Sequence, residues 1–210
     1  MNRKIRLVIF DLDGTLTTVD SLWRYLHEEF GTWDQGKIAA QKYKRGEISY
    51  REWAETDAKY WAGLPMSRLN DAVNRIPYRD GAKEVFQALR NRNIKTAIIS
   101  AGLSLLADKA AAELGADLVM SNELVSNDGR LTGEIRVKVA VNDKQRIVEE
   151  MAAELRVQLG EVALVGDRAF DLSQPQCLRI AFEPKDSFAK ANADIVVEDH
   201  DLSRILQYLI

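Results

Sequence analysis

The stretch Ile5-Arg6-Leu7-Val8-Ile9-Phe10-Asp11-Leu12-Asp13-Gly14-Thr15 lies near the start of this 210-residue chain and predicts a strand from the middle of a sheet. It begins as a continuous apolar run, which is typical of a strand covered on both faces of a parallel sheet. It ends in two carboxylates two residues apart, although like charges that close repel each other and resist desolvation. An ordinary Asp-Gly turn is one interpretation. We favour a second, in which the pair awaits a divalent cation or an electrophile.

Short apolar runs recur along the rest of the chain, with helical patterns between them. They predict strands at 5–10, 94–99, 118–120, 162–165, 179–182 and 195–197, and helices at 81–90, 103–114, 144–159 and 202–209. Gly115 and Gly160 are the expected helix stops. The pattern favours an α/β fold with a three-layer, Rossmann-like parallel sheet core. Ligands of such sheets bind beyond the carboxyl ends of the strands, where Asp11 and Asp13 fall.

Residues 18–77 interrupt this alternation with a mostly helical stretch. All four tryptophans and five of the six tyrosines lie in it or at its edge. We therefore expect two domains: a helical cap (lid) at 18–77, and a core at 1–17 and 78–210. The aromatic side chains form either an apolar pocket over a leaving group or, as we favour, the interior of a small helical lid. His27 and His200 have no visible partners, and we expect surface or structural roles for them.

A second interruption, residues 125–135, contains Asp128-Gly129 between two extended segments and predicts a β-hairpin.

Charge and composition narrow the classes of partner and compartment that we expect. The formal net charge is −3, which gives no indication of nucleic acid or of an anionic membrane surface as a partner. The single cysteine, Cys177, excludes an internal disulfide and fits a reducing compartment. Asp11 and Asp13 cut the first apolar run too short for a signal peptide, and no run elsewhere is long enough to cross a membrane. We expect a cytoplasmic protein, and its oligomeric state stays open.

Three further strand ends finish in polar side chains: Ser100-Ala101-Gly102, Asn142-Asp143-Lys144, and the stretch from Gly166 to Asp171. Together with the first aspartate pair, these stretches resemble, in order, the four motifs of the haloacid-dehalogenase-like (HAD) hydrolases. The resemblance covers nearly the whole chain. The position of the helical insertion, the Asp-Gly hairpin and the tail at 193–206 look most like the phosphoserine phosphatase branch.

The resemblance implies a Mg²⁺-dependent phosphomonoester hydrolase that acts on a small phosphorylated metabolite through an aspartyl-phosphate. Such esters are doubly charged and hydrolyse very slowly unaided, so a catalyst must neutralise charge and align an attacking group. A carboxylate can attack phosphorus and divide the reaction into two steps. Asp11 is the expected nucleophile and Asp13 the general acid and base. Asp11 and Asp167 would hold the metal, and the resemblance adds the Asp13 main-chain carbonyl as a third ligand.

The remaining motif residues have ordinary explanations when each is taken alone. Ser100 is then a helix N-cap, Lys144 a solvated surface lysine and Asp171 a cap or surface charge. In the motif context we expect Ser100, with the amides of Ala101 and Gly102, to bind phosphate. Lys144 would offset the phosphoryl charge, and Asp171 would support either the metal or the Lys144 amine.

The sequence departs from the family pattern in motif four and in the lid. Arg168 and Phe170 replace the usual glycine and asparagine, a change that motivates a non-catalytic alternative, a member that binds a phosphorylated ligand or a protein partner. A phosphotransferase that uses an alcohol acceptor is a further alternative. Asp20 falls near the acidic amine-binding position of the family. No arginine precedes Leu64-Pro65 where the phosphoserine enzymes carry a carboxylate-binding one, so we expect phosphoserine to be a poor substrate.

Overall fold

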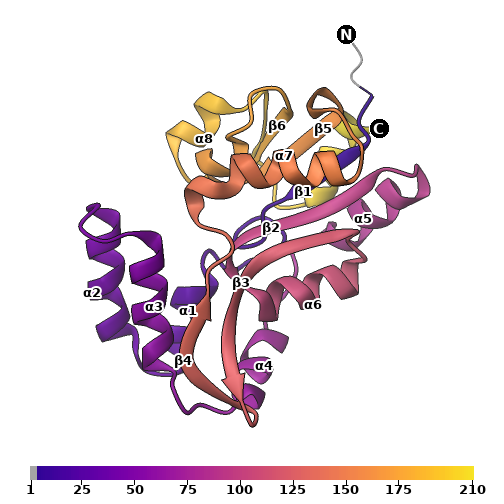
Figure 1. Ribbon diagram of the computed structural model, residues 1–210. Helices are drawn as coiled ribbons and strands as arrows, with labels where there is room; N and C mark the ends of the chain where they lie inside the picture. The colour runs from indigo at the N-terminus through magenta and orange to yellow at the C-terminus, as the bar shows by residue number, and fades with distance from the viewer. Residues whose placement is uncertain (1–3) are drawn as a thin grey trace.

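A single seven-stranded sheet organises the chain in the computed structural model, which describes residues 4–210, and its strand order is β4-β3-β2-β1-β5-β6-β7 (Figure 1). The strands are β1 (Leu7–Phe10), β2 (Lys95–Leu103), β3 (Leu118–Asn127), β4 (Arg130–Arg136), β5 (Val162–Gly166), β6 (Leu178–Phe182) and β7 (Ile195–Val197). Neighbouring strands are parallel except β3 and β4, which form the predicted antiparallel hairpin. The predicted α/β class is confirmed.

Helices fill the connections between the strands. The α-helices are α1 (Leu22–Glu29), α2 (Trp33–Lys44), α3 (Tyr50–Tyr60), α4 (Met66–Asn74), α5 (Ala82–Asn91), α6 (Ser104–Leu114), α7 (Lys144–Glu154), α8 (Ser187–Asn192) and α9 (Leu206–Leu209). Short 3₁₀ turns are η1 (Val141–Asp143), η2 (Leu159–Glu161), η3 (Ala169–Leu172) and η4 (Leu202–Ile205). Within residues 4–210, no helix has both the length and the apolar character needed to cross a membrane.

One predicted helix end is confirmed and another is wrong. Helix α6 ends at Gly115, whose φ of 78° is the left-handed conformation that glycine adopts without strain. Helix α7 ends well before Gly160, which lies in η2. Its stop is Arg156, with a φ of 55°, and the amide of Val157 donates back to the carbonyl of Ala152 at 2.8 Å. An arginine in this conformation gives no sequence signal comparable to a glycine.

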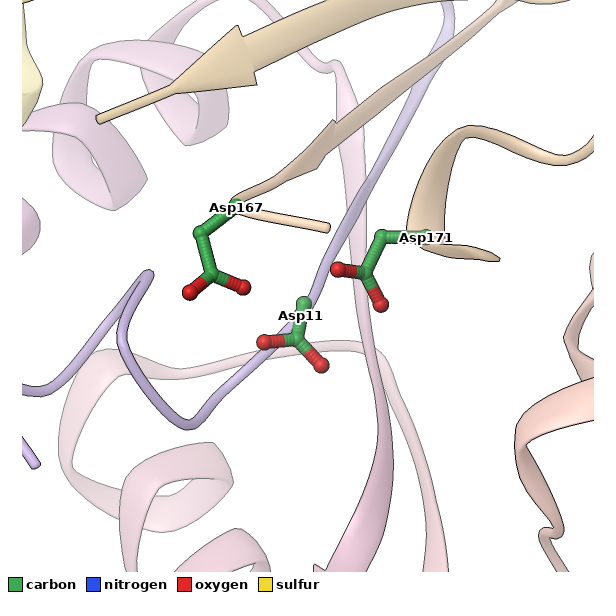
Figure 2. Close-up of side chains that lie close together, drawn as sticks. All are labelled: Asp11, Asp167 and Asp171. Carbon is green, nitrogen blue, oxygen red and sulfur yellow. The ribbon is translucent and has the colours of Figure 1, made fainter. Parts of the chain in front are cut away.

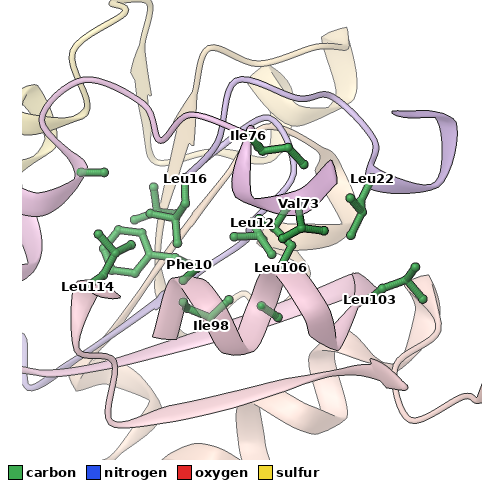
Figure 3. Close-up of a cluster of buried hydrophobic side chains, with 14 of the residues drawn as sticks. Phe10, Leu12, Leu16, Leu22, Val73, Ile76, Ile98, Leu103, Leu106 and Leu114 are labelled. Carbon is green, nitrogen blue, oxygen red and sulfur yellow. The ribbon is translucent and has the colours of Figure 1, made fainter. Parts of the chain in front are cut away.

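Strand β1 lies at the centre of the sheet, and all four of its residues are buried. Successive side chains of a strand point to opposite faces, and the two faces carry separate apolar clusters. Val8 and Phe10 belong to a cluster that includes residues of α5 and α6 (Figure 3). Leu7 and Ile9 belong to one that includes residues of α7. Burial on both faces therefore explains the continuous apolar run in the sequence.

The helices α1–α4 lie between β1 and β2 in the chain and share the core on one face of the sheet. Leu22, Val73 and Ile76 pack in the same cluster as Phe10 (Figure 3). The two ends of the insertion meet at an antiparallel bridge between Thr17 and Tyr78. Helix α3 lies beside β4 of the long β3–β4 hairpin (Figure 1).

Aromatic side chains fill the space between α1 and α3. The ring of Trp23 is centred 5.3 Å from that of Trp53 and 5.7 Å from that of Trp61. Trp61 is fully buried and Trp23 is nearly so. These contacts favour the interpretation of the aromatic residues as the interior of the helical insertion.

Candidate active site

Three carboxylates converge at the carboxyl ends of the central strands (Figure 2). Asp11 follows β1, Asp167 follows β5, and Asp171 lies in η3; one oxygen of each lies within 4.8 Å of the others. The reason is topological: β1 and β5 are neighbours with Phe10 beside Val165, so the residues after them emerge together. All three residues are buried.

Lys144 is the cation of this cluster. Its Nζ lies 2.6 Å from Oδ1 of Asp11 and 2.5 Å from Oδ1 of Asp171, and the residue is 3 % exposed. The interpretation of Lys144 as a solvated surface lysine is therefore wrong. Oδ2 of Asp171 accepts the backbone amide of Arg168 at 3.0 Å. Because both oxygens of Asp171 have donors, this carboxylate supports the lysine. The ring of Phe170, centred 5.3 Å from the ammonium, adds a cation–π contact.

The cluster carries more negative than positive charge. Burial and the charges of Asp11 and Asp171 raise the pKa of Asp167 to about 8. Burial and the Asp11 charge likewise raise the pKa of Asp171 to about 7, against the opposing effect of Lys144. Burial by itself would lower the pKa of Lys144, but the two carboxylates outweigh it and keep the pKa above its ordinary value. Lys144 is therefore charged, and the carboxylates of the cluster still favour the binding of a further cation.

The residues present fit a hard divalent cation. Oδ2 of Asp167 is buried and accepts no hydrogen bond from residues 4–210, and Nε of Arg168 lies 3.6 Å away. Gly14, with a φ of 83°, leaves this oxygen uncovered, because a Cβ there would lie only 2.6 Å from it. Carboxylate oxygens are the ligands that Mg²⁺ prefers. Asp11 and Asp167 can therefore supply carboxylate oxygens as ligands of such an ion.

Asp13 lies apart from this group, beside the end of β2 that contains Ser100 and Gly102. Its Oδ2 accepts the amide of Leu22 at 2.8 Å, and its Oδ1 is buried without a hydrogen-bond partner among the described residues. Burial raises the pKa of Asp13 to about 7; the Leu22 amide opposes this shift, and the charge of Asp11 adds to it. A Cβ on Gly102 would lie 3.2 Å from Oδ2. A carboxyl group that titrates near neutral pH is suited to both giving and taking a proton.

A bulge in β2 shapes the predicted phosphate loop. Ile99 pairs with Met120 and Leu103 with Asn122, so residues 100–102 oppose one residue of β3. Ser100 is buried, and its Oγ accepts the amide of Gly102 at 2.9 Å. Helix α6 begins only at Ser104, so the N-cap interpretation of Ser100 is wrong.

Asp20 lies at the rim, outside the buried carboxylate cluster. Its side chain is 64 % exposed and its Oδ1 lies 3.2 Å from Nζ of Lys185. The backbone amide of Lys185 in turn donates to the carbonyl of Asp167 at 2.9 Å. Lys185 lies outside the four motifs, so it could not be predicted from the sequence as part of the site.

Asn122 is a buried residue that sequence reasoning missed. Its Oδ1 accepts the amides of Lys138 and Val139 at 2.8 and 2.9 Å, and its Nδ2 donates to the carbonyls of Ala101 and Val139. It therefore joins the phosphate loop to the segment that leads into Lys144. Asn122 lies two residues beyond the predicted strand at 118–120 and in no motif, and asparagine is rare in strands, so the sequence did not point to it.

The insertion also contains a buried contact between a histidine and an aspartate that was not expected. Nε2 of His27 in α1 lies 3.1 Å from Oδ2 of Asp57 in α3, and both side chains are 1 % exposed. Nδ1 of His27 contacts the hydroxyl of Thr32 at 2.7 Å. No partner of either histidine was visible in the sequence; His27 has this buried, structural one, and the exposed His200 contacts Glu183. Asp57, which lies on α3 before Leu64-Pro65, faces α1 through this contact.

Known proteins resemble the chain throughout its length. A model of the haloacid dehalogenase-like hydrolase family matches residues 8–173. A phosphoserine phosphatase of Archaeoglobus fulgidus is 36% identical over 188 residues, which are 88% of this chain and 54% of that protein, so the chain spans about half of that relative. A phosphoserine phosphatase of Methanocaldococcus jannaschii is 32% identical over the full length of both proteins.

Solved structures agree with the sequence relatives. The structure of a phospho-aspartyl intermediate analogue of phosphoserine phosphatase has a TM-score of 0.85 and 30% identity, and the match covers 99% of this chain and 100% of that one. A substrate-bound phosphoserine phosphatase complex matches equally well, with a TM-score of 0.85. The chain belongs to the haloacid dehalogenase-like hydrolase family and, within it, to the phosphoserine phosphatase-like branch.

Proposed function

We propose that this hydrolase cleaves a phosphomonoester in two steps, with Asp11 as the residue that is transiently phosphorylated. The observation that carries the proposal is the convergence of Asp11, Asp167 and Lys144, which supplies a nucleophile, metal ligands and a charged ammonium within one buried cluster. Asp11 and Asp167 would hold Mg²⁺, which when bound neutralises charge on the phosphoryl oxygens.

In the first step, an oxygen of Asp11 attacks phosphorus and the bond from phosphorus to the leaving alkoxide breaks. Asp13, whose pKa is raised to about 7, gives its proton to that oxygen. Lys144 holds Asp11 in position and offsets its charge, so the carboxylate can approach an anionic ester. Ser100 and the amide of Gly102, which donates to the Ser100 hydroxyl, would receive the other phosphoryl oxygens.

In the second step, Asp13 is a carboxylate and takes a proton from a water molecule that attacks the phosphorus of phospho-Asp11. The bond from phosphorus to Asp11 then breaks, inorganic phosphate leaves, and both aspartates return to their starting states. Residues 18–77 would act as the cap that excludes other water, since Leu22 of α1 already donates to Asp13.

The names of the relatives make phosphoserine the first substrate to test. Asp20 at the rim is a candidate partner for an amino group, although Lys185 already pairs with it. The carboxylate of phosphoserine lacks an evident anchor on α3, because Asp57 is acidic and is paired with His27. The expectation that phosphoserine is a poor substrate therefore stays a prediction.

Hydrolysis of p-nitrophenyl phosphate tests the proposal. The wild-type protein should turn over the ester with Mg²⁺, lose turnover in EDTA, and regain it when Mg²⁺ is added in excess. Asp11→Asn should lose at least about 10³-fold in kcat while keeping its circular dichroism spectrum. No metal-dependent turnover by the wild-type protein on this ester or a panel of phosphorylated metabolites would overturn the proposal in favour of a non-catalytic binding role.

An alcohol acceptor added to the same assay distinguishes hydrolysis from phosphoryl transfer. Release of p-nitrophenol and inorganic phosphate should stay equal in the presence of glycerol if water is the acceptor. An excess of p-nitrophenol over phosphate would identify a phosphotransferase.

A further inference from the structure

Three hydrogen-bond donors from different elements meet at one backbone carbonyl, that of Ala101. The hydroxyl of Tyr50 in α3 donates to it, as do Nε1 of Trp23 in α1 at 3.3 Å and Nδ2 of Asn122 in β3 at 3.0 Å. Nδ2 of Asn122 also donates to the Tyr50 hydroxyl at 2.9 Å. The helical insertion therefore contacts the core at the central residue of the predicted phosphate loop, Ala101.

The carbonyl of Ala101 and the amide of Gly102 belong to the same peptide group. The structure has no cis peptide bond within residues 4–210, so the two groups point in opposite directions from one rigid plane. The amide end faces the phosphate loop, where it donates to Oγ of Ser100. Holding the carbonyl end therefore fixes the direction of the amide end.

We infer that Tyr50 is a positioning residue, which fixes the Gly102 amide for a phosphoryl oxygen when α3 docks on the core. The inference rests on the proposed function, and it concerns a residue that has no role in proton transfer or metal binding. Docking of the insertion then has a direct effect on the phosphate loop. If the insertion moved away from the core, Asn122 would be the one remaining side chain of these three that holds the peptide group between Ala101 and Gly102.

Because the hydroxyl of Tyr50 is buried, loss of its hydrogen bonds to Ala101 and Asn122 would be costly. The residue is 6 % exposed, and a buried hydroxyl without a partner is costly. Burial also raises the pKa of Tyr50 above its ordinary value, so the hydroxyl stays a donor at any working pH. Asn122 cannot rotate to replace it, because two backbone amides fix its Oδ1.

The variant Tyr50→Phe tests the inference, with Tyr43→Phe as the matched control. Tyr43 is a half-buried neighbour with its ring centred 5.9 Å from that of Tyr50, and its hydroxyl makes no hydrogen bond to Ala101 in the structure of residues 4–210. We expect kcat for p-nitrophenyl phosphate to fall about tenfold in Tyr50→Phe, which is the factor for one lost hydrogen bond. KM should change less than about twofold, because the effect is on the transition state. Tyr43→Phe should match the wild type.

A second measurement reports on the amide itself. In ¹⁵N-glycine-labelled protein, addition of orthovanadate with Mg²⁺ should shift the Gly102 amide resonance strongly in the wild type and in Tyr43→Phe. In Tyr50→Phe the shift should be smaller and the vanadate affinity about tenfold lower. A purely structural role of Tyr50 would lower the thermal midpoint without changing this resonance.

The outcomes separate this inference from the proposed function. Equal kcat and equal vanadate response in Tyr50→Phe and the wild type would overturn the inference and leave the hydrolase proposal intact. If the wild type has no turnover but its Gly102 amide responds to vanadate in a Tyr50-dependent way, the hydrolase proposal fails and the inference holds. A wild-type amide that does not respond to vanadate overturns the inference. If Tyr50→Phe does not fold, Trp23→Phe removes a second donor to the same carbonyl and is judged by the same two measurements.

Discussion

Nζ of Lys144 lies 2.6 Å from Oδ1 of Asp11, and both groups are buried although 133 residues separate them in the chain. The same ammonium also contacts Asp171, so one positive charge serves two carboxylates. Burial of such a group is unfavourable unless every partner is present. The arrangement thus makes the stability of the site depend on the residues that we propose for its chemistry.

Removal of the ammonium should therefore impair both turnover and folding. We expect Lys144→Met to lose at least about 100-fold in kcat, because the charge of the ester and of Asp11 is no longer offset. Removing one member of a buried ion pair also costs about 3–5 kcal/mol of unfolding free energy. Urea denaturation and turnover of p-nitrophenyl phosphate measure the two effects. Lys190→Met, at an exposed pair with Glu198, is the control, and equal losses in both variants would contradict the prediction.

The raised pKa values of the buried carboxyls predict how metal-free stability depends on pH. The pKa of Asp167 is raised to about 8 and that of Asp171 to about 7, both far above unfolded carboxyls. The folded state therefore binds more protons than the unfolded state between these values and the unfolded pKa. Stability from this source is complete at acidic pH and is lost as the pH rises through 7 and 8.

We accordingly expect the EDTA-treated protein to lose about 4 kcal/mol of stability between pH 6 and pH 9. Mg²⁺ should stabilise it more at pH 8.5 than at pH 6, because carboxylates must lose their protons to bind the ion. Urea denaturation with and without Mg²⁺ measures both trends. Asp167→Asn should flatten the pH dependence, and a metal-free protein that becomes more stable toward pH 9 would refute the assignment.

General acid catalysis by Asp13 should depend on the leaving group. A serine alkoxide needs a proton to leave, whereas p-nitrophenolate leaves readily without one. Asp13→Asn should therefore reduce the first step about 10²–10⁴-fold for an alkyl phosphate and much less for p-nitrophenyl phosphate. With the pKa of Asp13 raised to about 7, wild-type turnover of alkyl phosphates should decline above that pH. Rapid-quench measurement of phospho-Asp11 formation isolates this step, and equal losses on both esters would exclude the role.

The substrate preference follows from the pairing of Asp57 with His27. Position 57 of α3 carries an aspartate that contacts His27, so it offers no cation to a substrate carboxylate. That carboxylate should therefore contribute little binding energy. We expect kcat/KM for phosphoserine to exceed that for O-phosphoethanolamine, which lacks the carboxylate, by less than about tenfold. A ratio of 100 or more would show that a cation elsewhere binds the carboxylate. Arg51, exposed on α3 with Nη2 3.5 Å from the carbonyl of Val137, would then be the residue to change first.

The strands, the core helices other than α8, the helical character of residues 18–77 and the four motif segments were predictable from local sequence alone. These features depend on local properties: the period of apolar residues, the Asp-Gly turn and the conformational freedom of Gly115. The position of Asp11 after a strand buried on both faces was readable for the same reason. Helix α7 ends just before Arg156, which has a positive φ although it is not a glycine. No local sequence pattern marks this end, and the predicted stop at Gly160 was wrong.

Which of these segments meet, and what surrounds them, depends on contacts between distant parts of the chain. Asp11 and Asp167 come together because β1 and β5 are neighbours, a pairing between segments far apart in the chain. Burial of Lys144, the bonds of Asn122 and the pairing of His27 with Asp57 arise from the same long-range packing. A side chain's charge state and hydrogen-bond partners depend on its full surroundings, and those surroundings come from distant parts of the sequence.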